Sequence, residues 1–170
     1  MTFISDSLNR IKPSATMVIT AKATQLKREG KKVIGLSSGE PDFDTPQHVK
    51  QAAIDAINSG YTKYTNIEGI PELRQSIVEK FKKDNDLNYD VSNVIVGTGG
   101  KQILFNALMS SLNKDDEVII PAPYWVSYPD MTLLAGGKPI FVDCSSETNF
   151  KLTGEALDKV ITKNSKWLIL

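Results

Sequence analysis

Apolar positions along the chain follow a helical spacing in some stretches and form short uninterrupted runs in others. Helical spacing begins after Ser14, which suits an N-cap, and after Thr45-Pro46, a cap followed by proline at the first helical position. The first predicted helix runs to about Glu29 and stops at Gly30, and the second closes at Gly60. A third is expected from Gly69-Ile70-Pro71-Glu72, with one apolar face formed by Leu73, Ile77, Val78 and Phe81.

Short apolar runs predict strands at residues 32–36, 94–96, 118–120, 139–142 and 167–170. From residue 90 onward these runs alternate with helical patterns, which are expected after Gly100, through Leu134, and around Leu157, Val160 and Ile161. Strands that alternate with helices are typical of an α/β domain with a largely parallel sheet. The chain stops on four apolar residues, Trp167 to Leu170, which resemble a central strand. Because termini normally lie at the surface, we expect the sequence to be part of a longer one.

Composition excludes several classes of function. The 170 residues carry 20 basic and 20 acidic side chains, so there is no electrostatic reason to expect nucleic-acid or anionic-membrane partners. Apolar runs are too short to span a bilayer, and no signal-peptide pattern is visible. Cys144 is the only cysteine, which fits a reducing, cytoplasmic setting. His48 is also alone and is interpreted as a surface residue, and Glu40, Asp42 and Asp44 lack the glycine and distal glutamate of a calcium loop, so no metal site is predicted.

An aromatic segment bounded by prolines, residues 121–129, follows the predicted strand 118–120. Ligands of open α/β sheets bind outside the carboxyl ends of the strands, where the indole of Trp125 can stack on a flat cofactor. The alternative is a loop that tucks Trp125 under a neighbouring helix. From this segment alone the two interpretations are equally supported.

A glycine-rich turn, Gly97-Thr98-Gly99-Gly100, joins a predicted strand to a predicted helix. Small residues let a backbone approach a ligand closely, and a helix N-terminus favours phosphate. The turn matches neither a P-loop nor the pattern G-x-G-x-x-G, because Gln102 stands where the third glycine belongs. A tight structural turn and a phosphate site therefore both remain open, and Lys101 either adds a charge or extends into water.

Two upstream positions are also candidates for ligand binding. Gly39 follows the first predicted strand and can expose its backbone N–H to a carboxylate. Tyr61 and Tyr64 place two phenols in a loop, which favours an interface or a ligand site, although half-buried packing is the common explanation.

Taken together, the order and spacing of these motifs closely resemble the N-terminal part of class I pyridoxal-phosphate aminotransferases, in particular the bacterial aspartate (aspartate/prephenate) subgroup. The resemblance covers essentially all 170 residues. Six motifs match in order: residues 13–16, 39–43, 63–64, 69–74, 99–102 and 123–129.

The resemblance implies roles for individual residues. Gly99, Gly100 and Lys101 match the turn that binds the cofactor phosphate, and Trp125 matches the residue that stacks on the pyridine ring and borders the substrate. Gly39 matches the glycine whose backbone contacts the substrate carboxylate. Tyr64 matches the tyrosine that reaches the cofactor phosphate of the neighbouring subunit, which implies a homodimer with shared sites. Lys12 matches a basic position associated with prephenate use, and a surface lysine is the equal alternative.

The implied fold is α/β: the aspartate aminotransferase-like fold type I of pyridoxal-phosphate transferases, a mainly parallel sheet flanked by helices, incomplete in this chain. Residues 1–45 would form an N-terminal arm and part of the small domain, with Pro41 and Pro46 at the crossing. Residues 46–170 would form the first part of the large cofactor domain. A sheet that lacks its remaining strands is expected to expose apolar edges.

The implied reaction is amino transfer between L-aspartate, or also glutamate or prephenate, and a 2-oxo acid such as 2-oxoglutarate. The family's Schiff-base lysine would lie beyond residue 170, so we expect no catalytic residue in this chain and no activity from it alone. The alternatives are another fold type I pyridoxal-phosphate enzyme and a non-catalytic binding module derived from the same fold. No helix-turn-helix pattern precedes the family's own N-terminal segment, which counts against a transcription factor.

Overall fold

The computed structural model describes residues 3–37, 39 and 41–170. The chain divides into two compact units. The first contains the described part of residues 1–38 together with 104–170, and the second contains the described part of residues 39–103. The division falls within helix α4 (Gly100–Ser111).

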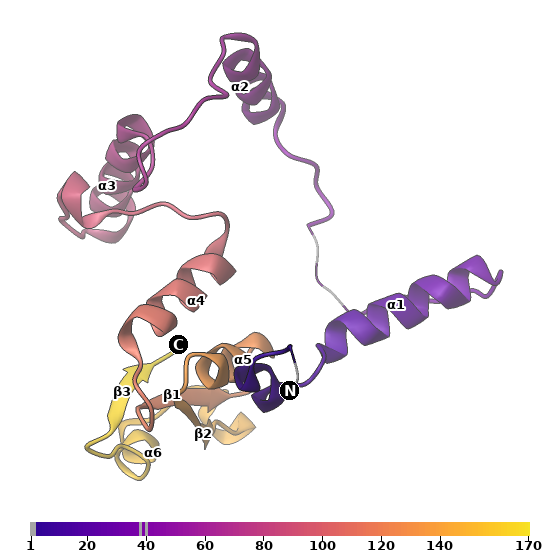
Figure 1. Ribbon diagram of the computed structural model, residues 1–170, viewed down its shortest axis with the longest axis vertical. Helices are drawn as coiled ribbons and strands as arrows, with labels where there is room; N and C mark the ends of the chain where they lie inside the picture. The colour runs from indigo at the N-terminus through magenta and orange to yellow at the C-terminus, as the bar shows by residue number, and fades with distance from the viewer. Residues whose placement is uncertain (1–2, 38, 40) are drawn as a thin grey trace. The chain divides into compact units, whose positions relative to one another are not determined.

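A parallel sheet forms the centre of the first unit (Figure 1). In the described part of the chain it has three strands, in the order β2 (Lys138–Asp143), β1 (Glu117–Ala122), β3 (Ser165–Leu168). Ile119 at the middle of β1 pairs with Ile140 on one side and Leu168 on the other. Connections of parallel strands must cross over, and α5 (Ser127–Leu134) connects β1 to β2 while η3 (Ser146–Thr148) and α6 (Gly154–Asp158) connect β2 to β3. The α/β fold with a parallel sheet flanked by helices is therefore confirmed.

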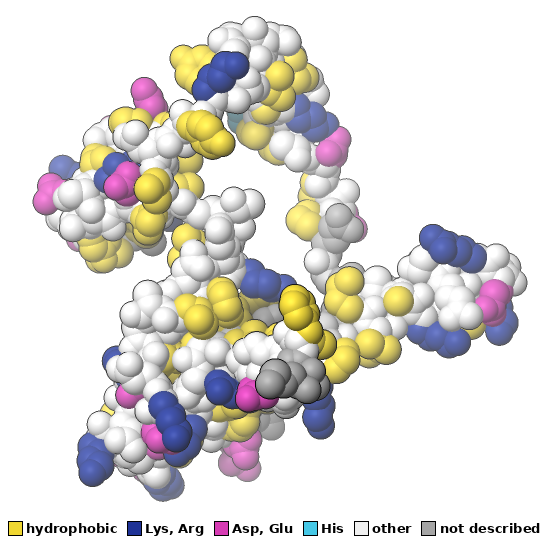
Figure 2. Space-filling model, in the orientation of Figure 1, with side chains coloured by type: hydrophobic (Ala, Val, Ile, Leu, Met, Phe, Trp, Pro, Cys, Tyr) yellow, Lys and Arg dark blue, Asp and Glu magenta, His cyan; other side chains and the backbone are white. Residues whose placement is uncertain are grey.

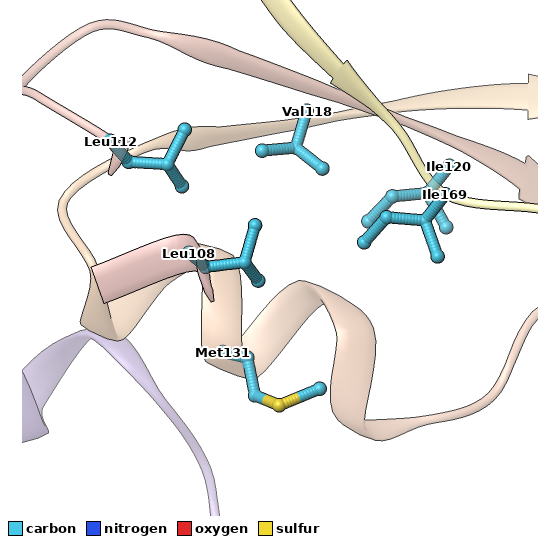
Figure 3. Close-up of a cluster of buried hydrophobic side chains, with 6 residues drawn as sticks. All are labelled: Leu108, Leu112, Val118, Ile120, Met131 and Ile169. Carbon is cyan, nitrogen blue, oxygen red and sulfur yellow. The ribbon is translucent and has the colours of Figure 1, made fainter. Parts of the chain in front are cut away.

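The buried core of this unit lies between β1 and the helices α4 and α5. Figure 3 shows Leu108 of α4 pointing toward the strands, above Met131 of α5. Val118 and Ile120 of β1 are fully buried, and the cluster is completed by Leu112 and Ile169. Because alternate residues of a strand point to the same face, Val118 and Ile120 together fix the face of β1 that packs on the helices.

The N-terminal part of the first unit contains η1 (Asp6–Arg10) and α1 (Ala15–Arg28). The guanidinium of Arg10 donates a hydrogen bond to the backbone oxygen of Leu133 at 3.3 Å, at the C-terminal end of α5. Cations are favourable at that end of a helix. Ser14 caps α1 as predicted, accepting from the N–H of Met17, and Gly30 follows the helix with φ +80°.

The second unit contains α2 (Gln47–Asn58), α3 (Pro71–Asn85) and η2 (Val91–Asn93). Proline occupies the first turn of α3, as the sequence predicts, but α2 begins one residue later than expected, with Pro46 rather than Thr45 at the N-cap. Asp86 ends α3 in the left-handed conformation. Arg74 of α3 donates to the backbone oxygen of Val91 at 2.6 Å, which ties α3 to η2.

Two predicted strands are wrong. Residues 32–36 and 94–96 form no strand in the described chain. Val96 donates a single backbone hydrogen bond, to Glu68 at 2.9 Å, and residues 33–36 line an open groove together with residues of α1. Apolar, β-branched runs favour strands. A strand forms, however, only where a neighbouring strand provides partners for its backbone hydrogen bonds. The last predicted strand is displaced to Ser165–Leu168, and the backbone N–H of Ile169 continues its pairing with Ile119 at 3.1 Å.

Large apolar side chains are exposed over both units (Figure 2). In the first unit they include Phe141 on β2 and Leu168 on β3, so both outer strands of the sheet present apolar surface. In the second unit they include Val49, Ile54 and Ile57 of α2. No described helix is long and apolar enough to cross a membrane.

Candidate functional site

The aromatic segment forms the wall of an open pocket at the carboxyl end of the sheet. The pocket measures about 620 Å³, and its lining includes Trp125, Tyr128, Phe150, Lys151 and Ile169. The indole of Trp125 is 41% exposed, so it lines the pocket and is not tucked under a helix. Of the two interpretations of this segment, the structure therefore supports a cleft wall.

Ring contacts hold the aromatic segment against the rest of the first unit. Tyr124 stacks on Phe141 of β2, with ring centroids 5.0 Å apart and planes inclined by 16°. Trp125 meets Tyr128 edge-on at 5.5 Å, and Tyr128 packs against the buried core. An exposed indole whose neighbours are fixed in this way offers a defined flat surface to a ligand.

The glycine turn of the second unit has the geometry of an anion site. Gly99 has φ +82°, and an added Cβ would meet nothing within 4 Å, so open space lies beside its backbone. Gly100 is the first residue of α4, a twelve-residue helix whose N-terminal amides have no partners within the helix. The space and the helix start suit a phosphate group.

Hydrogen bonds inside the turn define its shape. The N–H of Thr98 donates to the side-chain oxygen of Gln102, and the N–H of Gly99 donates to the oxygen of Gly97 at 3.0 Å. Gly97 is packed tightly, since a Cβ there would lie 2.5 Å from Cδ1 of Ile103. Gln102, which breaks the dinucleotide-binding pattern in the sequence, thus has a structural role in closing the turn.

The remaining predicted site residues are exposed. Tyr64 is fully exposed and lines a hollow of about 580 Å³ with Tyr61 and Lys63. Gly39 is exposed, with nothing within 4 Å of an added Cβ, and Lys12 is exposed two residues after η1. Glu40, within the motif that carries Gly39, lies outside the described residues.

Each unit contains its own subset of these residues. Trp125 and Lys12 belong to the first unit, while Gly39, Tyr64 and the turn with Gly99, Gly100 and Lys101 belong to the second. Their roles in binding stay predictions.

The sequence did not predict that Phe150 and Lys151 line the same pocket as Trp125. Asn149 and Phe150 both have positive φ, 52° and 58°. Asparagine adopts this conformation readily, but it is strained for a bulky residue, and Phe150 is 61% exposed beside Lys151. Asn149 was the only sequence signal for this turn, and asparagine is too common in loops to identify a pocket.

Charged groups cluster at the opposite end of the sheet, where β1 begins. A hydrogen bond from Lys138 at 2.9 Å lowers the pKa of Asp115 and raises that of Lys138. The backbone N–H of Asn113, at 2.7 Å, and then Lys166, at 2.9 Å, lower the pKa of Asp116. In the second unit Lys50 lowers the pKa of Asp44. The pairs of Asp115 and Asp116 lie at the opposite end of β1 from the pocket, so we interpret them as structural.

A metal centre finds no support in the described residues, where no three His, Cys, Asp or Glu side chains gather. Taken separately, two features of the described residues suit parts of a pyridoxal phosphate group: the open backbone at Gly99 in the second unit suits a phosphate, and the half-exposed Trp125 in the first unit suits a flat ring.

Known proteins similar to this chain are aminotransferases. A "Probable aspartate/prephenate aminotransferase" of Rickettsia bellii is 59% identical over 170 residues, covering 100% of this chain and 43% of that protein. An "Aspartate/prephenate aminotransferase" of Cereibacter sphaeroides is 59% identical over 169 residues, covering 99% of this chain and 42% of that protein. The chain thus spans less than half the length of these relatives.

A solved structure of the aspartate aminotransferase from Thermus thermophilus with maleate superimposes with a TM-score of 0.96 at 45% identity, covering 100% of this chain and 44% of that one. This agreement confirms the predicted fold type. The model of the family "Aminotransferase class I and II" matches residues 31–170. With more than half of its length matched, the chain belongs to the class I and II aminotransferase family.

Proposed function

We propose that this chain is the N-terminal part of a pyridoxal-phosphate-dependent aminotransferase that moves an amino group between L-aspartate and a 2-oxo acid such as 2-oxoglutarate. The observation that carries the proposal is the 59% identity, along the whole chain, to proteins named aspartate/prephenate aminotransferases. The pocket at Trp125 and the turn at Gly99 are its support in the residues themselves.

Residues of this chain would bind and orient the cofactor. Gly99, Gly100 and Lys101 would hold the phosphate, since the turn offers an open backbone and a helix start. Trp125 would fix the plane of the ring, with Tyr128 holding the indole in place. When bound, the cofactor supplies an electron sink for the negative charge left on the substrate's α-carbon.

The substrate would be recognised partly by this chain. The exposed backbone N–H of Gly39 is suited to donate a hydrogen bond to the carboxylate shared by amino acids and 2-oxo acids. Lys12 is exposed and cationic, and would favour a second carboxylate, as in prephenate. The lysine that forms the covalent link to the cofactor would lie beyond residue 170, so the proton transfers at the substrate are assigned to no residue here.

We further infer that the protein is a homodimer in the cytoplasm. Tyr64 has a fully exposed phenol, which suits contact with the cofactor phosphate of a neighbouring subunit. The single cysteine, Cys144, is unpaired and buried, as expected in a reducing compartment. Residues 1–45 would belong to the arm and small domain, and residues 46–170 to the large domain.

Steady-state assays of the full-length protein test this proposal. With added cofactor it should convert aspartate and 2-oxoglutarate to oxaloacetate and glutamate, whereas residues 1–170 alone should not. Turnover by residues 1–170 would contradict the assignment of the lysine to the missing part. A full-length protein that binds the cofactor but transaminates neither aspartate nor prephenate would favour another fold type I enzyme. One that binds no cofactor would favour a non-catalytic module.

A further inference from the structure

One face of helix α1 is covered by the chain that follows it. Thr16, Thr20, Ala23 and Leu26 are half-buried, while most of their neighbours in the helix are exposed. Their spacing of three to four residues places them along one side of the helix. The chain turns back after Gly30, whose φ of +80° permits the reversal, and residues 33–37 then run beside this side of α1.

The contact between α1 and residues 33–37 is incomplete. A groove of about 570 Å³ remains between them, lined by Val18 and Leu26 on the helix and by Val33 and Leu36 on the segment. Ile34 is 88% exposed and Leu36 91% exposed, so neither contributes much apolar burial. Apolar packing alone therefore holds this segment weakly.

A hydrogen bond joins the two at the end of the segment. The hydroxyl of Thr20 lies 3.0 Å from the hydroxyl of Ser37, in a partly buried position. Of the described hydrogen bonds, this is the one that residues 32–37 make with α1, and the preceding residue is tied to the same helix by the N–H of Lys31, which donates to the backbone oxygen of Leu26 at 3.0 Å. Partial burial makes this bond more valuable than one at the surface, because water competes less well for the two hydroxyls.

Ser37 stands two residues before Gly39, the predicted contact of the substrate carboxylate. Two residues span at most about 7 Å, so fixing Ser37 restricts where the backbone of Gly39 can lie. We propose that Thr20 and Ser37 are positioning residues: their hydrogen bond holds Ser37 on α1 and, because Gly39 is only two residues further along the chain, limits the freedom of the Gly39 backbone that would contact the substrate. This inference rests on the proposed aminotransferase function.

The expected signature of this role is a change in substrate binding that both substrates share. Amino acid and 2-oxo acid carry the same carboxylate, so losing the bond should raise KM for aspartate and for 2-oxoglutarate together. A partly buried neutral hydrogen bond corresponds to about a three- to ten-fold change. The kcat should fall less than KM rises, and the preference between aspartate and prephenate should not change.

The test uses Thr20→Val and Ser37→Ala in the full-length enzyme with cofactor bound. Thr20→Ser should restore KM, because it keeps the hydroxyl. Thr24→Val is the matched control: it is the same change one turn away, and the Thr24 hydroxyl only donates to the Thr20 carbonyl of its own helix at 2.9 Å. The double variant should resemble the more severe single variant, since both remove one bond.

Three outcomes would overturn the proposal: a KM for Thr20→Val equal to that of Thr24→Val, no rescue by Thr20→Ser, or additive effects of Thr20→Val and Ser37→Ala. Amide hydrogen exchange gives a second readout that needs no activity. Exchange at residues 33–39 should accelerate about three- to ten-fold in Thr20→Val and not in Thr24→Val. If the wild-type enzyme is inactive, the proposed function fails, while the exchange result still decides whether the bond fastens the segment.

Discussion

The indole ring of Trp125 stands perpendicular to the phenol ring of Tyr128, with centroids 5.5 Å apart and an interplanar angle of 87°. Tyr128 packs against the buried core, whereas Trp125 is 41% exposed at the pocket. Tyr128 thus connects a rigid part of the first unit to an exposed aromatic surface. Such edge-on pairs contribute about 0.5–1.5 kcal/mol beyond the area they bury.

Replacing Tyr128 should weaken cofactor binding by removing the ring that holds Trp125 in place. In the full-length protein, Tyr128→Leu removes the ring that fixes the indole and should lower the affinity for pyridoxal phosphate by about two- to ten-fold. Tyr128→Phe keeps the ring and should bind as the wild type does. The affinities of both variants can be measured by titrating the apoprotein with pyridoxal phosphate and monitoring the absorbance of the cofactor. Equal affinities for the Leu and Phe variants would show that the ring contact has no such role.

Gly99 provides a test of the glycine turn. Gly99→Ala places a side chain at φ +82° with no steric contact within 4 Å, so its cost is backbone strain of about 1–2 kcal/mol. If the backbone of Gly99 borders the phosphate, the same change should lower the affinity for pyridoxal phosphate about ten-fold or more and leave that for pyridoxal nearly unchanged.

Gly30→Ala is the matched control for this prediction. Gly30 has φ +80° and also has open space around it, but it lies at the end of α1, away from the glycine turn in the sequence. Gly30→Ala should reduce the stability of the protein about as much as Gly99→Ala does, without lowering the affinity for pyridoxal phosphate. A parallel loss of affinity in both variants would mean that strain, not phosphate contact, is responsible.

The buried cluster of the first unit should be sensitive to volume. Leu108 is 1% exposed and lies between α5 and β1. Leu108→Ala should destabilise the protein by about 2–5 kcal/mol through the lost transfer free energy and the cavity left behind. Leu108→Met nearly conserves volume and should cost less than about 1.5 kcal/mol. Thermal denaturation measures both, and a similar melting temperature for the two variants would contradict this packing.

Much of the fold could be predicted from local pattern. Ser14 and Pro71 set the starts of α1 and α3, and the apolar run at residues 118–120 became the central strand. These features depend on capping residues and on the spacing of apolar residues, both of which can be read from the sequence. The predictions of strands at residues 32–36 and 94–96 were wrong because strand formation requires a partner strand, and no local pattern reveals whether one is present.

The candidate site divides in the same way. The position of Trp125 just past a strand end indicated either a cleft wall or a packed loop, and only the family resemblance favoured the first. Phe150 and Lys151 could not be identified, since only the left-handed turn at Asn149 brings them to the pocket. The hydrogen bond between Thr20 and Ser37 was equally invisible, because it joins positions seventeen residues apart through the packing of an unpaired segment on α1.

Lowering the pH should reduce the stability of the folded protein, partly through protonation of Asp116. Its pKa is lowered from 3.8, first by the N–H of Asn113 and then by Lys166. A carboxyl whose folded pKa is lowered stabilises the fold above its ordinary pKa, and that contribution is lost as pH falls through the lowered value. Asp116→Asn should therefore reduce the melting temperature of the full-length protein by about 2 °C at pH 7. The difference from wild type should shrink below about pH 4.

Lys166→Gln separates the two causes. It removes the second partner of Asp116 and leaves the hydrogen bond from Asn113, the larger cause, in place. Its melting temperature should fall less than that of Asp116→Asn, and added salt should diminish its effect because exposed charges are screened. Melting curves between pH 3 and pH 7 measure both variants. If Lys166→Gln were as destabilising as Asp116→Asn, the ion pair would dominate over the backbone hydrogen bond, contrary to the geometry around Asp116.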